Sequence, residues 1–244
     1  MEKNFRSTNI DKIEYTTSVG ENKLLRSSFS WMALAMLLSS AAAFLFAFNP
    51  DFTALLFEQS EAGLKPTIFA YVAMFAPLAF VFAISFGLNR MSYSTLIILF
   101  VAYSIVNGIS FSFIFFIYEL GSIATVFLST TALFAIMAIA GYTTKTDLTK
   151  LGSLLMIGVV GIFVASLINM FMGSAKMDYI ISILGVVIFT GLTAYDVQKI
   201  KNIGHEIGDS ESGKKLGLMG ALTLYLDFVN LFLFLLRLFG GRKN

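Results

Sequence analysis

Seven long apolar stretches are the feature of this sequence that most restricts its fold. A helix of roughly 20 apolar residues crosses a hydrocarbon core about 30 Å thick. The chain is 57% hydrophobic and only 13% charged, whereas soluble domains carry about 25% charged residues. The sequence therefore predicts an all-α, polytopic membrane protein. Its transmembrane domain covers residues 30–240, with spans at 30–48, 66–88, 94–118, 122–141, 151–172, 179–198 and 216–238.

The remaining segments and the residue usage exclude several classes of protein. Residues 1–29 are polar and of mixed charge, and they predict a flexible segment that is too long and too acidic to begin a cleaved signal peptide. The apolar run 52–57 is too short to span a bilayer. The chain has no cysteine, which excludes disulfides, thiol catalysis and thiolate metal sites. A net charge of +2 provides no basic patch for nucleic acid, so the predicted partner is the lipid bilayer, and no cofactor is expected.

The charges of the connecting loops predict the orientation, because Lys and Arg stay preferentially on the cytoplasmic side of a membrane. One set of loops contains only Lys65 and Lys176, whereas the N-terminus and the loops on its side contain many more such residues. The N-terminus is therefore predicted to be cytoplasmic. Seven crossings would place Arg237, Arg242 and Lys243 outside, against the same rule, so the side of the C-terminal tail is left open.

An acidic residue within the last apolar stretch, TLYLDFVNLFLFLLR, indicates a functional site. Asp227 would cost about 2.5–3.5 kcal/mol at the centre of a span, so such a residue faces a bundle interior or a wet cavity. Thr223 and Asn230 lie one turn before and one turn after it, and the three residues share one helix face. The alternative is a polar contact that only holds helices together, for which a neutral side chain would be sufficient. Asp227 is therefore predicted to be a functional or gating carboxylate.

A second carboxylate, Asp196, lies near the end of the sixth span. By itself it can be an interfacial residue that faces cytosolic water beside Lys199 or Lys201. The sixth and seventh spans are antiparallel neighbours joined by a short loop, so Asp196 can also meet Asp227. Two facing carboxylates share a proton part of the time and can take a cation. The pair then predicts a site that senses protons or calcium, with both aspartates as calcium ligands.

The two aspartates are predicted to lie at different depths in the membrane, which argues against their pairing. Along the helix axis, Asp227 lies about 18 Å from Lys215, whereas Asp196 lies about 5 Å from Lys199. The two carboxylates can meet only if the last helix begins below the membrane edge or sits deep within the bundle.

Arg90 closes the second span at the same predicted rim as Asp196. It is either an anchor that extends to lipid headgroups or a gating counter-ion. In the second reading, pairing of Arg90 with a carboxylate closes the site, and a proton or a cation releases it.

The motifs TAYDVQKIK (193–201) and LYLDFVNLFLFLLRLFG (224–240) resemble the carboxyl-terminal half of the Bax inhibitor-1 family. With the seven-span layout, the resemblance covers most of the chain. It implies a bacterial member, in the inner membrane, in which six helices surround a central seventh and which acts as a pH-sensitive calcium leak channel. It also implies that Asp196 and Asp227 form the dyad that senses protons and calcium, and that an ion pair of Arg90 with Asp196 favours the closed state.

Two other classes of protein remain as alternatives. A membrane interaction protein would regulate a membrane protease or a cell-death factor, with the polar segment 1–29 as its contact. An intramembrane aspartyl protease would use the two aspartates to activate water, but such enzymes carry one of them in a GxGD setting. This chain has LYLD instead, in which bulky side chains crowd Asp227. We therefore expect that the protein is not an enzyme.

Overall fold

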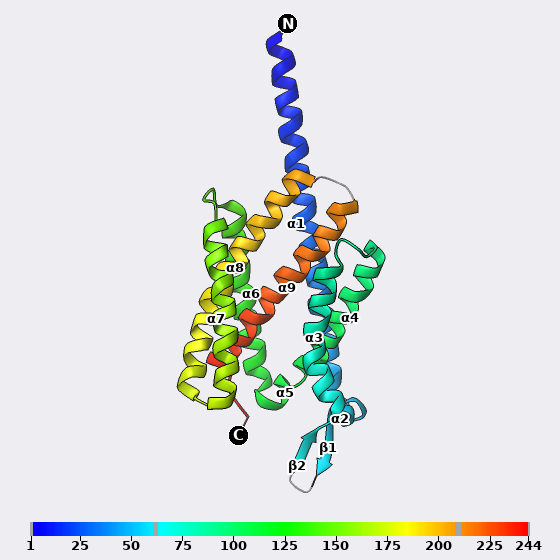
Figure 1. The fold of residues 1–244 in the computed structure, drawn as a ribbon, viewed down its shortest axis with the longest axis vertical. Helices are drawn as coiled ribbons and strands as arrows, with labels where there is room; N and C mark the ends of the chain where they lie inside the picture. The colour runs from blue at the N-terminus through cyan, green and yellow to red at the C-terminus, as the bar shows by residue number, and fades with distance from the viewer. Residues whose placement is uncertain (1, 61–62, 208–210, 244) are drawn as a thin grey trace. The chain divides into compact units, whose positions relative to one another are not determined.

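The computed structural model describes residues 2–60, 63–207 and 211–243, with side chains described within 23–59, 65–205 and 212–243. Among these residues, seven helices are long and apolar enough to cross a membrane (Figure 1). Each coincides with one of the seven predicted spans, although the first and the sixth are distinctly longer. The prediction of a seven-helix membrane protein is confirmed. The spans are Lys23–Phe48, Ile68–Gly87, Tyr93–Ile117, Leu120–Thr143, Thr149–Met172, Ala175–His205 and Ser212–Phe239.

The elements of secondary structure follow one another in a simple order. They are α1 (Glu2–Phe48), α2 (Pro50–Leu56), β1 (Phe57–Ser60), β2 (Gly63–Pro66), α3 (Ile68–Gly87), α4 (Tyr93–Phe111), α5 (Ile114–Ile117), α6 (Leu120–Thr143), α7 (Thr149–Met172), α8 (Ala175–Ile207) and α9 (Glu211–Phe239).

Short polar side chains set the starts of several helices. Asn49, Thr67 and Ser92 precede α2, α3 and α4, and each accepts a hydrogen bond from a backbone N–H of the first turn. Such caps satisfy donors that a new helix leaves without a partner. At the other end of a span, Gly173 terminates α7 with a φ of 63°, a left-handed conformation that favours glycine.

Three features differ from the simplest reading of the apolar pattern. The short run at 52–57 lies in α2 and at the start of β1, which pairs antiparallel with β2. The third span is divided at Ser112, so α5 follows α4 after a short turn. The helix α1 begins at Glu2, so residues 2–29 continue the first span as a helix, and the predicted flexibility of this segment stays a prediction.

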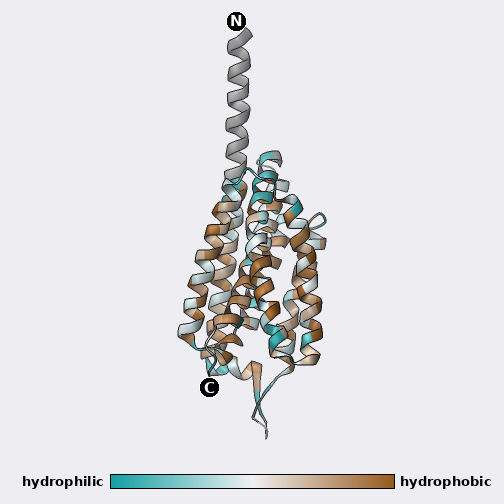
Figure 2. Ribbon diagram, turned by 90° about the vertical axis from the view of Figure 1, so that its left-hand side faces the viewer, coloured by the Kyte–Doolittle hydropathy of each residue, from teal (hydrophilic) through white to brown (hydrophobic). Residues whose placement is uncertain are grey.

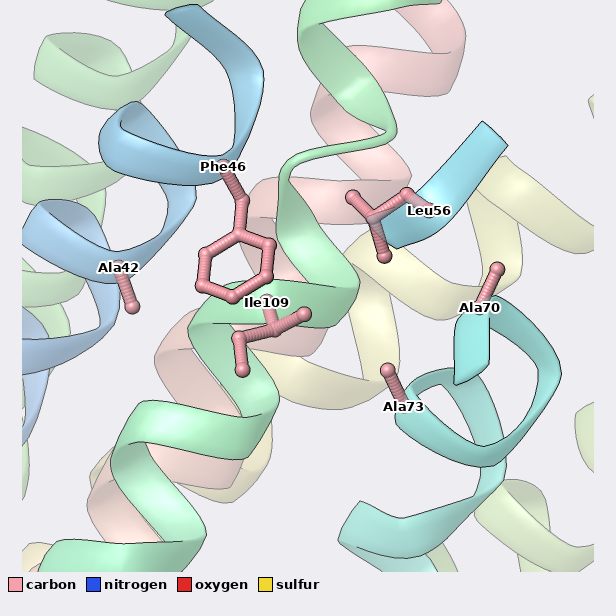
Figure 3. Packing of buried hydrophobic residues seen from close by; sticks show 6 residues of the cluster. All are labelled: Ala42, Phe46, Leu56, Ala70, Ala73 and Ile109. Carbon is pink, nitrogen blue, oxygen red and sulfur yellow. The ribbon is translucent and has the colours of Figure 1, made fainter. Parts of the chain in front are cut away.

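The chain divides into two compact units. The second unit contains residues 31–129 and 239–244. In it, α3 packs against α4, and an apolar cluster joins α1, α2, α3 and α4 around Phe46, Leu56, Ala70 and Ile109. Figure 3 shows Phe46 and Ile109 pointing toward each other within this cluster. The Oγ of Ser39 donates a 2.7 Å hydrogen bond to the Ser104 carbonyl, which links α1 to α4.

The first unit contains residues 1–30 and 130–238, and it holds α7, α8 and nearly all of α9. Here α7 packs against α8, and small residues allow helices to approach closely. A Cβ at Gly141 of α6 would meet the backbone of Ala194 in α8, and one at Gly220 of α9 would meet Ser28 and Ile200. Close packing through glycine is a usual device of membrane helices.

Burial differs widely among the spans. In α7, only 11% of the most apolar window is buried, whereas in the last span the fraction is 67%, the highest of the seven. Figure 2 shows hydrophobic residues along the lengths of the helices and hydrophilic residues near their ends. The surface of α7 therefore suits lipid contact, and α9 has the burial predicted for a central seventh helix.

The end of the chain is fixed by its own hydrogen bonds. The backbone N–H of Glu119 donates to the Gly241 carbonyl, and that of Lys243 donates to Ile117, both at 2.9 Å. The Nζ of Lys243 also donates to the Phe115 carbonyl. The tail thus lies beside the connection between the third and fourth spans.

Candidate functional site

The helix α8 carries Asp196 well inside its length. The predicted sixth span ends at residue 198, but α8 continues to Ile207. Asp196 therefore lies about 16 Å from the end of its helix, and it is only 6% exposed. The charges of Lys199 and Lys201 mark the rim of the apolar segment, but they do not end the helix.

This longer helix brings the two predicted carboxylates together. Asp227 lies in α9, is 4% exposed, and is about 24 Å along its helix from Glu211. The extension of α8 reduces the mismatch in depth from about 13 Å to about 8 Å. The carboxyl groups of Asp196 and Asp227 lie close enough to interact electrostatically. We call this pair the dyad.

The chemistry of the dyad follows from its contacts. A hydrogen bond between two carboxyl groups needs a proton, because an ionised carboxylate only accepts. The Oδ2 atom of Asp227 is buried without a hydrogen-bond partner among the described residues. Buried oxygen atoms of this kind interact strongly with an incoming charge, since little solvent screens them. The dyad can therefore hold a proton or, when both groups are ionised, attract a cation.

The two supporting polar residues satisfy their donors within α9 itself. The Oγ1 of Thr223 donates to the Met219 carbonyl at 3.1 Å, and the Nδ2 of Asn230 donates to the Leu226 carbonyl at 2.8 Å. Both side chains are half-buried. Their predicted role in supporting Asp227 stays a prediction, although Thr223 also lines a cavity that reaches Asp196.

This cavity has a volume of about 180 Å³ and lies among α1, α8 and α9. Its lining includes Leu24, Asp196, Lys199, Met219 and Thr223. A cavity needs about 10–15 Å³ to hold one water molecule, so this one has room for several. We call it the dyad pocket.

The sequence interpretation missed the residue that fixes α8 from its other side. The backbone N–H of Leu148 donates to Oε1 of Gln198 at 2.9 Å, and Nε2 of Gln198 donates to the Thr146 carbonyl at 2.8 Å. A buried glutamine thus holds the α6–α7 connection against α8. The only signal in the sequence is a long amide side chain two residues after Asp196.

The second unit contains Arg90, in the connection between α3 and α4. Its backbone N–H donates to the Gly87 carbonyl in a turn, and its side chain is exposed. Asp196 and Asp227 belong to the first unit, so the role of Arg90 as counter-ion to the dyad stays a prediction.

The dyad supplies only part of a calcium coordination shell. Calcium takes about six to eight oxygen ligands. Within the residues that the structure describes, no group of three or more His, Cys, Asp or Glu side chains could hold a metal ion. A calcium ion at the dyad would need further oxygen ligands from water or from the backbone.

Comparisons with known proteins cover nearly the whole chain. A protein-family model described as inhibitor of apoptosis-promoting Bax1 matches residues 21–244. An uncharacterised protein of Borreliella burgdorferi is 43% identical over 92% of this chain and 94% of its own length. An uncharacterised protein of Rickettsia prowazekii is 38% identical over 94% of each chain. The inner membrane protein YbhL of Escherichia coli is 39% identical over 88% of this chain and 90% of its own length.

Proposed function

This chain belongs to the Bax inhibitor-1 family of integral membrane proteins, and on that premise we propose that it is a pH-sensitive calcium leak channel. The observation that carries the proposal is the dyad, two buried carboxyl groups that lie close enough to interact on successive membrane-spanning helices. Intramembrane carboxylates are costly, and they mark ion and proton pathways. The membrane in question is the bacterial inner membrane, with the N-terminus cytoplasmic.

Protons and calcium compete at the dyad in this proposal. When both carboxylates are ionised, they attract a divalent cation and repel each other. The Arg90 guanidinium pairs with Asp196 and holds the closed state, because an arginine–carboxylate pair is strong where water is excluded. A proton on Asp196 removes the charge that Arg90 binds. Calcium flux is therefore expected to rise as the pH falls.

The test is calcium flux through purified protein in liposomes that contain a calcium-sensitive dye. The wild-type protein should pass calcium down its gradient, with flux that changes with pH. The double variant Asp196→Asn/Asp227→Asn should lose this pH dependence, because carboxamides do not titrate. Asp51→Asn is the matched control, since Asp51 is exposed at the start of α2. Equal flux from the double variant and the wild type at every pH would end the proposal.

The family description also supports a second candidate, a membrane interaction protein that regulates a membrane protease or a cell-death factor. Its contact would be the polar N-terminal segment. Deletion of residues 2–22 separates the two candidates, because it spares Leu24 and Ser28, which contact α9. A leak channel keeps its flux after this deletion, whereas a tethered regulator loses its effect on the partner.

The intramembrane aspartyl protease is the weaker third candidate. A protease must admit substrate backbone to its aspartates, and Leu224 and Tyr225, just before Asp227, are fully buried. Cleavage of a membrane-spanning peptide by the wild-type protein, abolished by Asp227→Asn, would favour this candidate over the leak channel.

A further inference from the structure

The dyad pocket extends from Asp196 in one direction only along the helices. Its α8 residues beyond the aspartate, Ile200 and Ile203, follow it toward the end of α8, and its α9 residues, among them Met219 and Thr223, all precede Asp227. The pocket thus lies between the dyad and the α8–α9 connection. Its polar lining residues are Asp196, Lys199 and Thr223, and the rest of its wall is apolar or glycine.

The third wall of the pocket is α1, held against α9 by close contacts. The Oγ of Ser28 donates a 3.0 Å hydrogen bond to the Gly217 carbonyl. A Cβ at Gly217 would come within 2.9 Å of the Ser27 hydroxyl, which shows how closely α1 and α9 approach here. The wall is therefore formed by packed helices, and its shape is determined by the fold.

Two ionisable residues line the pocket, and they stand at different depths. Asp196 is 6% exposed, whereas Lys199, three residues later, is exposed. Residues three apart lie on the same helix face, and Lys199 is close enough to Asp196 for an electrostatic interaction. The Nζ of Lys199 lies 5.8 Å from the centre of the Tyr195 ring. Asp227 faces Asp196 from α9, behind the pocket.

We propose that the dyad pocket is the path by which water, protons and cations reach the dyad from the side of the α8–α9 connection, and that Lys199 is its electrostatic filter. A narrow path with apolar walls focuses the field of a charge at its mouth. The positive charge of Lys199 lowers the local concentration of cations in the pocket and raises that of anions. The purpose of this path rests on the proposed function, but its existence can be tested without any flux measurement.

The test uses single cysteines, because the natural chain contains none. Thr223→Cys places a thiol in the deep part of the pocket, one turn before Asp227. Ile157→Cys is the matched control, since Ile157 is 69% exposed on the apolar surface of α7. Two hydrophilic methanethiosulfonate reagents are compared in proteoliposomes, one with a cationic trimethylammonium group and one with an anionic sulfonate group. Thr223→Cys should react at least about tenfold faster than Ile157→Cys, because a thiolate forms only where water reaches it.

The filter is tested in the Thr223→Cys background. Lys199→Gln should raise the ratio of cationic to anionic labelling rates about three- to sixfold at low ionic strength, and high salt should reduce the effect. The ratio cancels any change in thiol reactivity. Lys201→Gln is the matched control, because the Nζ of Lys201 donates to the Tyr142 carbonyl and lies over the Tyr142 ring, away from the pocket. Lys199→Arg should keep the wild-type ratio.

The outcomes separate cleanly. If Thr223→Cys is labelled no faster than Ile157→Cys, the proposal that the dyad pocket is a path for water is rejected. Met219→Cys provides a second position if Thr223→Cys does not fold. Equal ratios in Lys199→Gln and Lys201→Gln would overturn the filter. The expected labelling pattern in a protein that passes no calcium would leave this inference intact and reject the proposed function instead.

Discussion

Asp196 and Asp227 illustrate what a single residue type can reveal in an apolar sequence. A carboxylate within a span is costly enough that its presence indicates a sheltered polar site, and both aspartates are nearly fully buried. The sequence could therefore single out these two aspartates as candidates for a sheltered position. Their contact could not be predicted, because it depends on how far α8 continues past its last apolar residue.

Gln198 and Lys199 mark the limit of sequence reasoning at this scale. The sequence does not show whether a glutamine side chain faces solvent or forms hydrogen bonds to a connection. Only the fold places Thr146 and Leu148 opposite the amide of Gln198. In the same way, the sequence does not distinguish Lys199 from the other basic residues at the edge of the membrane. Its place beside Asp196 at the dyad pocket follows from helix packing.

The first prediction at the residue scale concerns Arg90. If its guanidinium holds the dyad in the closed state, Arg90→Ala should raise calcium leak at neutral pH by several-fold, because about 1 kcal/mol of lost ion pairing changes an equilibrium about fivefold. The measurement is the rate of dye response in proteoliposomes at pH 7.

Arg26→Ala is the control for this variant, because Arg26 is an exposed arginine on α1. An unchanged or smaller leak in Arg90→Ala would reject the counter-ion role and leave Arg90 as an anchor at the lipid headgroups.

A second prediction tests the clamp formed by Gln198. Gln198→Ala removes two part-buried hydrogen bonds to the α6–α7 connection, each of which contributes about 0.5–1.5 kcal/mol. Hydrogen exchange in residues 144–148 should become faster by at least about tenfold. The exposed neighbour Asn202 provides the control variant Asn202→Ala. Equal exchange in the two variants would show that the connection is held by other contacts.

At the scale of elements, the seven spans follow from apolar length alone, since a bilayer requires it. The ends of helices follow a different rule. Charged residues mark where the apolar segment leaves the hydrocarbon, but a helix continues as long as its backbone bonds are made, which is why α8 extends past Lys199 to Ile207. The short α2 and the strands β1 and β2 lack the length or the periodicity that sequence reasoning needs.

Close helix packing gives the prediction that belongs to this scale. Gly141→Ala would place a methyl group against the backbone of Ala194, which cannot move aside as a flexible side chain could. The variant should lose about 1–3 kcal/mol of stability through overpacking. Gly161→Ala is the matched control, because a Cβ there meets nothing within 4 Å, and it should be neutral or slightly stabilising.

Thermal unfolding in detergent measures both glycine variants. A melting temperature for Gly141→Ala equal to that of Gly161→Ala would mean that α6 and α8 do not approach as closely as described.

For the whole molecule, the orientation in the membrane is the principal prediction. A fluorescent protein that matures only in the cytoplasm should be bright when fused to the N-terminus. Alkaline phosphatase, which folds only outside the cytoplasm, should be active when joined to the C-terminus through a linker. The physical reason is the excess of Lys and Arg on the N-terminal side together with seven crossings. If alkaline phosphatase is active at the N-terminus and the fluorescent protein is bright at the C-terminus, the orientation is the reverse of the predicted one.

The side of the tail shows why counting charges could not settle the topology. Arg242 and Lys243 suggested a cytoplasmic end, yet the last residues are bonded to the α5–α6 connection. Arg237 forms a 3.0 Å ion pair with Asp178 at the start of α8. The sequence alone does not show these contacts.

The bonded tail has a consequence for how the protein is made. Residues 241–243 follow the last span, and their partners at 115–122 are synthesised more than a hundred residues earlier. These bonds can form only after the final helix has been made and inserted. A chain that stalls during insertion therefore exposes an unsatisfied loop between the third and fourth spans, and cellular quality-control proteases could recognise incomplete insertion there.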